Sequence, residues 1–94
     1  MSDEERKLMG RRIRDIRTQR GFTIRQLAEM AGLSETHMGN IERGGKVGLE
    51  TLIVLVRALD VSLDYIVMGV HPQTGGYGLL FRSDDELESM ILID

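Results

Sequence analysis

The chain has 94 residues and no cysteine, so it is long enough for one small domain and a short appendage. Without cysteine, neither disulfides nor thiolate-bound zinc can stabilise the fold, which must therefore depend on its apolar core. Hydrophobic residues make up 41% of the chain and aromatic residues only 4%, so that core must be aliphatic. The formal net charge of −3, taken over the whole chain, argues against a nucleic-acid-binding protein.

Membrane insertion and secretion are not indicated by the sequence. The longest apolar runs, such as 52–56 and 90–93, are far shorter than the ~20 residues that a membrane-spanning helix needs. The N-terminus is acidic and lacks the apolar run of a secretory signal. Both observations favour a cytoplasmic protein that does not bind a membrane.

A glycine-rich cluster at 72–78, which begins with the only proline, is the clearest structural breaker in the chain. We therefore predict a main domain over 1–69 and a C-terminal tail over 70–94. Within the tail, the apolar spacing of 84–93 predicts a last helix, which is too short to be stable unless it packs on something. The tail is a candidate dimerisation or partner-binding segment.

Within 1–69, apolar residues recur at helical spacing in five segments separated by glycines and capping residues. The sequence therefore predicts a compact all-α domain of five short helices: one between Ser2 and Gly21, then 24–31, 34–42, 49–59 and 63–67. The residues expected on the apolar faces are Met9, Ile13, Ile16, Leu27, Ala28, Ala31, Met38, Ile41, Leu49, Leu52, Ile53, Val56, Leu59, Leu63, Ile66 and Val67.

The segment 24–42 has the spacing of a helix-turn-helix. Ala28 supplies a small residue where the first helix presses on the second, and Gly32 tolerates a positive φ in the tight turn. The apolar anchors of the second helix are Leu33, Met38 and Ile41. Its exposed face is expected to carry Glu35, Thr36, Gly39 and Asn40, which are all small or polar.

Two stretches, RIRDIRTQRGFTIRQLAEMAGLSETHMGNIERG and LETLIVLVRALDVSLDYIVMG, carry a family resemblance. Together they cover about 10–69 without a gap, and they resemble the lambda repressor/Cro-like family, also called the xenobiotic-response-element (XRE) family. The resemblance implies a compact five-helix DNA-binding domain. It also implies a sequence-specific transcriptional regulator, usually a repressor that binds a palindromic operator as a homodimer.

The resemblance further implies that the helix over 34–42 reads double-stranded DNA. The positions that touch base edges are Glu35, Thr36 and Asn40; asparagine suits adenine N6 and N7, and glutamate can accept from cytosine N4. Phosphate contacts are expected from Thr23, Arg25, Ser34, His37, Arg43 and Lys46. Arg17 and Glu42 match a pair that forms an internal salt bridge in the family.

The chain departs from the family pattern at three places. Ile24 stands where the family usually has a glutamine that helps to hold DNA. Gly39 lies inside the recognition helix, at a cost of roughly 0.5–1 kcal/mol relative to alanine, and would permit close approach of DNA. Val47 and Gly48 replace the usual Pro-Ser before the fourth helix.

The charge is distributed unevenly along the chain. The segment 6–25 contains eight basic residues and one acidic residue, and we expect part of this cluster to face phosphate rather than form an ordinary solvated surface. Residues 1–69 carry 11 basic and 10 acidic groups, whereas 70–94 carries one basic and five acidic groups. The acidity of the chain therefore belongs to the tail, and it does not exclude DNA binding by the main domain.

No enzyme is predicted, because no nucleophile–base pair is suggested by the sequence. Two distant histidines without cysteine do not make a metal site, and no cofactor is expected. One alternative function remains open: an antitoxin-like or adaptor protein-interaction module that binds DNA weakly or not at all. Its acidic tail would then bind a partner protein, and Glu35, Ile24 and the net acidity favour this alternative modestly.

Overall fold

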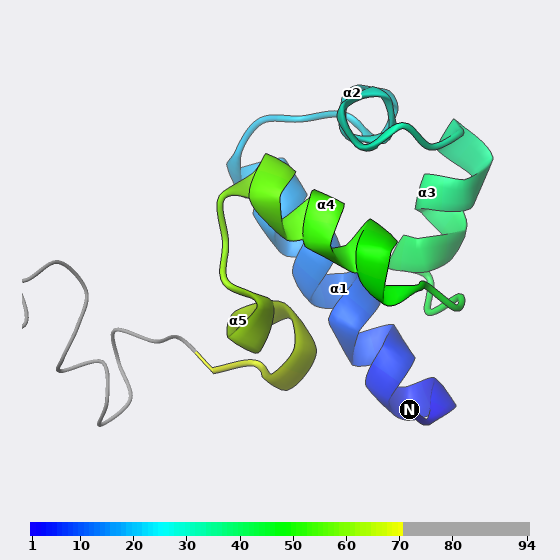
Figure 1. The fold of residues 1–94 in the computed structure, drawn as a ribbon, viewed down its shortest axis with the longest axis vertical. Helices are drawn as coiled ribbons and strands as arrows, with labels where there is room; N and C mark the ends of the chain where they lie inside the picture. Colours follow the sequence, from blue (N-terminus) through cyan, green and yellow to red (C-terminus); the bar gives the residue numbers. More distant parts are fainter. Residues whose placement is uncertain (71–94) are drawn as a thin grey trace, which may run out of the picture.

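Residues 1–70 are described by the computed structural model of the chain (Figure 1). Their regular structure is entirely helical and consists of α1 (Asp3–Gln19), α2 (Ile24–Ala31), α3 (Glu35–Glu42), α4 (Leu49–Leu59) and α5 (Leu63–Met68). The prediction of an all-α, five-helix fold is therefore confirmed. The last helix predicted over 84–93 lies outside the described residues. Within residues 1–70, none of the helices has the length and apolar character required to cross a bilayer.

Capping side chains determine where the helices begin. At the start of α1, the Oγ of Ser2 accepts from the backbone N–H of Glu5 at 3.1 Å, and Oε1 of Glu5 accepts from the backbone N–H of Ser2 at 2.8 Å. This second bond holds the pKa of the Glu5 carboxyl below its ordinary value. The same reciprocal pattern joins Thr23 and Gln26 at the start of α2. The other side-chain caps are Ser34 for α3 and Ser62 for α5.

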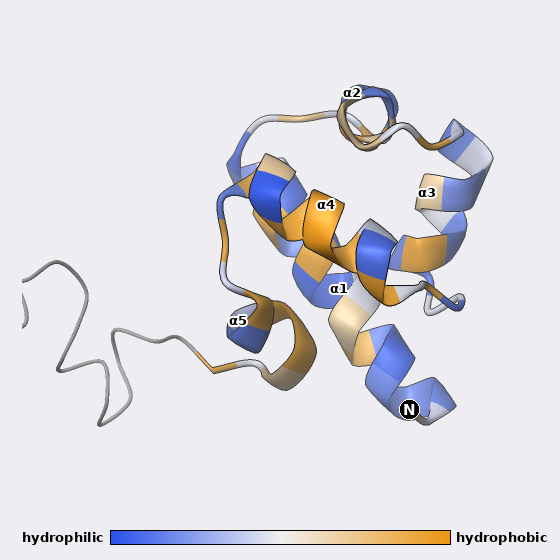
Figure 2. Ribbon diagram, in the orientation of Figure 1, coloured by the Kyte–Doolittle hydropathy of each residue, from blue (hydrophilic) through white to orange (hydrophobic). Residues whose placement is uncertain are grey.

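An aliphatic core fills the space between the helices. In the bundle, α2 packs on α3 and α4, α1 packs on α3 and α5, and α4 packs on α5. Figure 2 shows α4 as a predominantly hydrophobic helix, whereas the N-terminal part of α1 is hydrophilic. The buried core residues are Met9, Ile13, Ile16, Leu27, Ala28, Met38, Ile41, Leu52, Leu55, Val56, Leu59 and Ile66.

The prediction of a buried side chain is wrong for two residues, Leu49 and Leu63, which are both exposed. Each is the first residue of its helix, and Leu49 lies a full turn before Leu52, the first buried side chain of α4. Leu55, which is not among the predicted core residues, is fully buried. Helical periodicity identifies the apolar face of a helix, but it does not say where along the helix the neighbouring elements stop covering that face.

Two arginines of α1, Arg6 and Arg12, and its C-cap residue Arg20 bind backbone carbonyl groups at the ends of other elements. Arg12 Nη1 donates to two carbonyls of the last turn of α5, at 3.1 and 3.2 Å. Arg20 donates to the last carbonyl of α4 and to the one after it, at 2.8 and 2.9 Å. Arg6 Nε donates to Gly44 O, in the turn after α3, at 3.1 Å. Since the last carbonyls of a helix have no partner within it, these contacts join α1 to the C-terminal ends of three elements.

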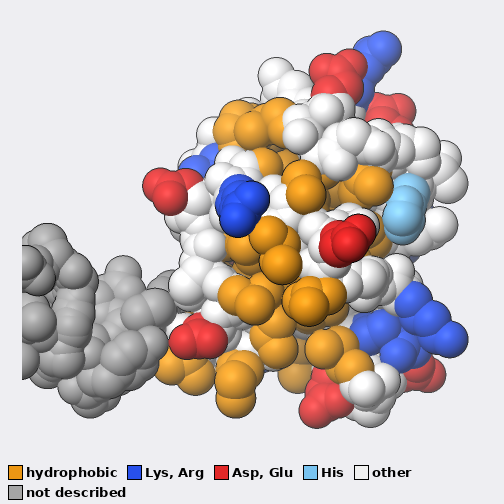
Figure 3. Space-filling model, viewed as in Figure 1, with side chains coloured by type: hydrophobic (Ala, Val, Ile, Leu, Met, Phe, Trp, Pro, Cys, Tyr) orange, Lys and Arg blue, Asp and Glu red, His pale blue; other side chains and the backbone are white. Residues whose placement is uncertain are grey.

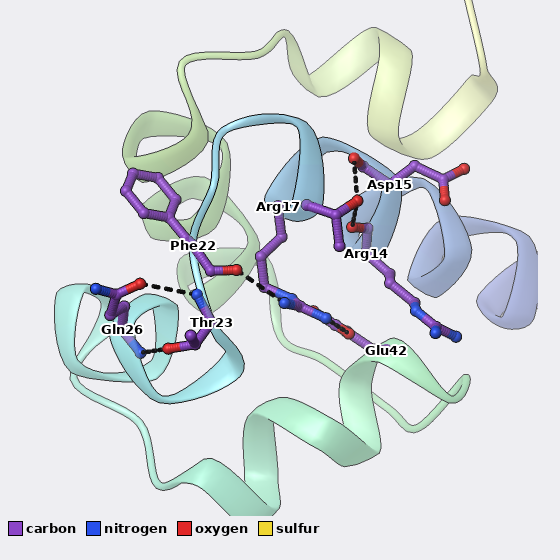
Figure 4. A network of polar contacts seen from close by, with 8 residues as sticks. Arg14, Asp15, Arg17, Phe22, Thr23, Gln26 and Glu42 are labelled. Carbon is purple, nitrogen blue, oxygen red and sulfur yellow. Dashed lines mark hydrogen bonds and ion pairs between the residues drawn. The ribbon is translucent and has the colours of Figure 1, made fainter.

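The junction between α1 and α3 combines a close backbone approach with a buried ion pair. A Cβ at Gly10 would lie 2.5 and 2.6 Å from the carbonyl oxygens of Glu42 and Ile41. Further along α1, Arg17 Nε lies 2.7 Å from Glu42 Oε2 and Nη2 lies 3.1 Å from Oε1, while Nη1 donates to Phe22 O at 2.9 Å (Figure 4). The expected Arg17–Glu42 salt bridge is therefore confirmed, and both side chains are at most 10% exposed.

The two glycines inside helices are expected to respond in opposite ways to alanine. Gly10→Ala should destabilise the domain by about 1–3 kcal/mol, because the new methyl would meet backbone atoms that cannot move independently of α3. Gly39→Ala should be neutral or stabilising by up to ~1 kcal/mol, because alanine favours the helix and the nearest atom, at 3.2 Å, ends a flexible arginine. Urea unfolding followed by circular dichroism measures both values, and equal stability of the two variants would contradict the expectation.

Removing one partner of the buried ion pair should cost far more than removing an exposed charge. Arg17→Met leaves the Glu42 carboxylate buried without a counter-charge, and we expect a loss of about 3–5 kcal/mol in the free energy of unfolding. The matched control is Arg25→Met, since Arg25 lies 4.0 Å from Glu29 and both side chains are more than 70% exposed. That control should change stability by less than ~0.5 kcal/mol in the same unfolding experiment. A similar, small effect of both variants would show that the Glu42 carboxylate can stay buried without its counter-charge at little cost.

Candidate nucleic-acid interface

At one end of the bundle, α2 and α3 form the predicted helix-turn-helix. In Figure 1, α2 is seen nearly end-on while α3 runs across the view, so the two helices cross steeply. The connecting turn begins at Gly32 with a φ of +71°, in the left-handed region that favours glycine, and Leu33 N–H donates to Ala28 O at 2.8 Å. The buried side chains of Met38 and Ile41 fix the inner face of α3 against the core.

The outer face of α3 carries four exposed side chains: Glu35, Thr36, His37 and Asn40. Three of them are the residues predicted to read bases. The expectation that Gly39 is also exposed is wrong, because Gly39 is buried. The guanidinium of Arg43 covers it, with Nη1 3.2 Å from the position that a Cβ would take.

Arg43 and Asn40 are joined by a hydrogen bond. Arg43 is the C-cap residue of α3, and its side chain reaches back along the helix so that Nη2 donates to Oδ1 of Asn40 at 2.7 Å. From the sequence, Asn40 is predicted to contact bases and Arg43 to contact phosphate. The structure brings them together on one face of α3.

The other predicted phosphate-binding residues lie around α2 and α3. Thr23 and Ser34 are the N-caps of the two helices, where each hydroxyl accepts a backbone N–H and can still donate its own hydrogen. Arg25, His37 and Lys46 are exposed. Figure 3 shows the histidine and a group of Lys and Arg side chains on the side of the domain where α3 lies. Thr23, Ser34 and Arg25 all lie where the N-terminal amides of α2 or α3 would add to the attraction of an anion.

A hollow of about 290 Å³ opens between α1, α2 and α3. Its lining residues are Arg14, Arg17, Ile24, Gly39, Glu42 and Arg43. Of its three arginines only Arg17 is paired with a carboxylate, and among the described residues the Arg14 guanidinium has no hydrogen-bonding partner. The hollow can therefore accept an anion such as a backbone phosphate.

Arg14 is a candidate site residue that was predicted only as part of the basic segment 6–25 and not by itself. The signal was available, because Arg14 lies three residues before Arg17 and so on a neighbouring position of the same helix. Four arginines of the basic segment 6–25 bind other parts of the domain: Arg6, Arg12, Arg17 and Arg20. Fewer residues of that segment therefore remain as candidates for phosphate contacts.

No group of three or more His, Asp or Glu side chains within residues 1–70 could hold a metal ion. The residues of the interface contain hydrogen-bond donors and acceptors of the kinds that contact bases and phosphates. Their arrangement on and around one exposed helix is suited to binding along a groove.

Comparison with known proteins agrees with this geometry. A family model described as helix-turn-helix matches residues 13–66. The HTH-type transcriptional regulator YobD of Bacillus subtilis (strain 168) is 39% identical over 57 residues, which are 60% of this chain and 51% of YobD. Control protein C.SmaI of Serratia marcescens is 36% identical over 59 residues, which are 62% of this chain and 70% of that protein.

A third relative is the SPbeta prophage-derived HTH-type transcriptional regulator YonR of Bacillus subtilis (strain 168), 31% identical over 67 residues. The match covers 70% of this chain and 62% of YonR. The chain thus spans about half the length of YobD and more of the other two. On the matched residues and the geometry of α2 and α3, the chain belongs to the helix-turn-helix family of DNA-binding transcriptional regulators, of the lambda repressor/Cro (XRE) type.

Proposed function

We propose that this chain is a sequence-specific transcriptional repressor that binds a palindromic operator as a homodimer. In this proposal α3 enters the major groove and α2 crosses the DNA backbone, with two half-sites about 34 Å apart. The observation that carries it is the outer face of α3, where polar side chains are held at the surface by the buried anchors Met38 and Ile41. The family match and the relatives named as transcriptional regulators support it.

Within this proposal the residues divide into two groups. Base edges are read by Glu35, Thr36 and Asn40. Phosphates are bound by Thr23, Arg25, Ser34, His37, Arg43 and Lys46, and Arg14 joins this group because its guanidinium borders the hollow beside α2 and α3. The phosphate contacts position α3, and the base contacts supply the sequence preference.

The homodimer is supported by exposed apolar side chains away from α3. Figure 3 shows hydrophobic side chains gathered over α4 and α5, and among the exposed ones are Leu49, Val54, Leu63 and Met68. An apolar patch of this kind, rimmed by charged residues, is typical of an interaction surface, and a second copy of the chain would bury it symmetrically. We propose that 1–69 is the DNA-binding domain and that the tail over 70–94 strengthens the dimer or binds a partner protein.

Selection of bound sequences from a random DNA pool tests the proposed function directly. The full chain should enrich one palindromic sequence and bind it with an affinity that falls steeply as salt rises, because several phosphates are neutralised. Asn40→Ala should relax the preference at one base pair of each half-site and cost ~1–3 kcal/mol on the enriched sequence. The control Arg57→Ala, an exposed residue of α4, should leave the base preferences unchanged. An unchanged profile for Asn40→Ala would refute its role.

Truncation after Gly69 tests the tail. If the tail strengthens the dimer, the truncated chain should have a lower dimer fraction than the full chain at the same concentration. Light scattering measures the two masses, and circular dichroism checks that the shorter chain keeps its helices. A dimer of unaltered stability would assign association to the α4 and α5 surface and refute the tail's contribution.

The second candidate function is an antitoxin-like or adaptor module whose tail binds a protein partner. It is favoured by the carboxylate of Glu35, exposed in the first turn of α3 where it repels phosphate, and by the acidity of 70–94. The two functions predict different results in the selection experiment. A pool in which no sequence is enriched at physiological salt would exclude the proposed repressor and favour the interaction module.

A further inference from the structure

The recognition helix carries a pair of side chains, Asn40 and Arg43, whose open groups are mostly hydrogen-bond donors. Nη2 of Arg43 donates to Oδ1 of Asn40 at 2.7 Å, and both side chains are exposed. Arg43 takes one of the two lone pairs of Oδ1, the only acceptor atom of the Asn40 side chain, so the amide group that stays wholly open to another molecule is Nδ2, which carries two N–H donors. The guanidinium of Arg43 adds further N–H donors and has no acceptor.

Gly39 makes this pair possible. The guanidinium lies where a side chain of residue 39 would begin: a Cβ there would be 3.2 Å from Nη1 and 3.5 Å from Nη2 of Arg43. A larger side chain at 39 would occupy the space that the guanidinium now fills. The absence of a large side chain at position 39 therefore leaves room for Arg43 to reach back from the end of α3 to Asn40.

The pair changes which base Asn40 can recognise. A free asparagine pairs with adenine in the major groove by accepting from N6 and donating to N7. In this chain Arg43 takes one lone pair of Oδ1 and places its positive charge beside the other, which disfavours a further bond from the N6 amino group of adenine. Guanine presents O6 and N7, which are both acceptors, and they match the donors of Asn40 Nδ2 and Arg43.

We propose that Arg43 sets the base preference of Asn40, so that the pair selects guanine where Asn40 alone would select adenine. This inference rests on the proposed DNA-reading function and deepens it, because it gives Arg43 a role beyond a phosphate contact. Arg43 is here a positioning residue for Asn40 and a donor in its own right. Gly39 is the residue that permits the arrangement.

The test compares base preferences in the same random-pool selection for the unmodified chain, Arg43→Met and Gly39→Leu. The position read by Asn40 is identified first, as the one at which Asn40→Ala loses its preference. At that position the unmodified chain should prefer guanine over adenine by on the order of tenfold. Arg43→Met should prefer adenine there, because Oδ1 is free to accept from N6.

Gly39→Leu separates the arrangement from the charge, because it keeps the cation of Arg43 but fills the space over residue 39. It should shift the preference in the same direction as Arg43→Met. The control Arg57→Met removes a positive charge from α4 and should leave guanine preferred. Circular dichroism checks that each variant keeps the helical content of the unmodified chain.

Each result decides the inference. A guanine-to-adenine change in Arg43→Met supports it, whereas the same base in both chains, with only weaker binding, would reduce Arg43 to a phosphate contact and overturn it. Adenine in the unmodified chain would also overturn it, while leaving the proposed function intact. If the unmodified chain enriches no sequence at all, the proposed function itself fails.

Discussion

The buried ion pair between Arg17 and Glu42 is the contact on which the position of α3 depends. Glu42 is the last residue of α3, and Arg17 also holds the carbonyl of Phe22 in the loop that leads to α2, so one guanidinium joins α1 to both parts of the helix-turn-helix. Charges this well buried contribute little net stability when compared with an apolar replacement. Their effect is on geometry, because a bidentate pair permits only a narrow range of positions for α3 relative to α1.

Other arginines along α1 also join it to the rest of the domain. Arg6 and Arg12 of α1 and its C-cap Arg20 bind the turn after α3 and the C-terminal carbonyls of α5 and α4. Hydrogen bonds from α1 thus hold the ends of the other helices in place. A large part of the positive charge near the N-terminus is therefore used inside the domain. The cations that we propose for DNA are Arg14, Arg25, Arg43 and Lys46, none of which makes such a contact to another helix end within residues 1–70.

Local chemistry was predictable from the sequence, and long-range pairing was not. The starts of α1, α2, α3 and α5 follow from Ser and Thr caps, and the left-handed turn follows from Gly32, because these depend on residues within a few positions of one another. The basic segment 6–25 gave no sign of which arginines would meet a helix end. That depends on which helix C-terminus lies beside α1 after folding, and an arginine bound to a carbonyl has the same sequence signature as one facing solvent.

The amino-acid sequence by itself determined the five helices, the helix-turn-helix and the residue types on the outer face of α3, because periodicity, capping and turn conformation are local properties. Only the tertiary structure decided that Gly39 lies under Arg43, that Arg43 is bound to Asn40, and that Arg14 borders a hollow between three helices. These features depend on where long, flexible side chains come to rest once the helices are packed. For the same reason the candidate residues could be named from the sequence, but the donors and acceptors that they present together could not.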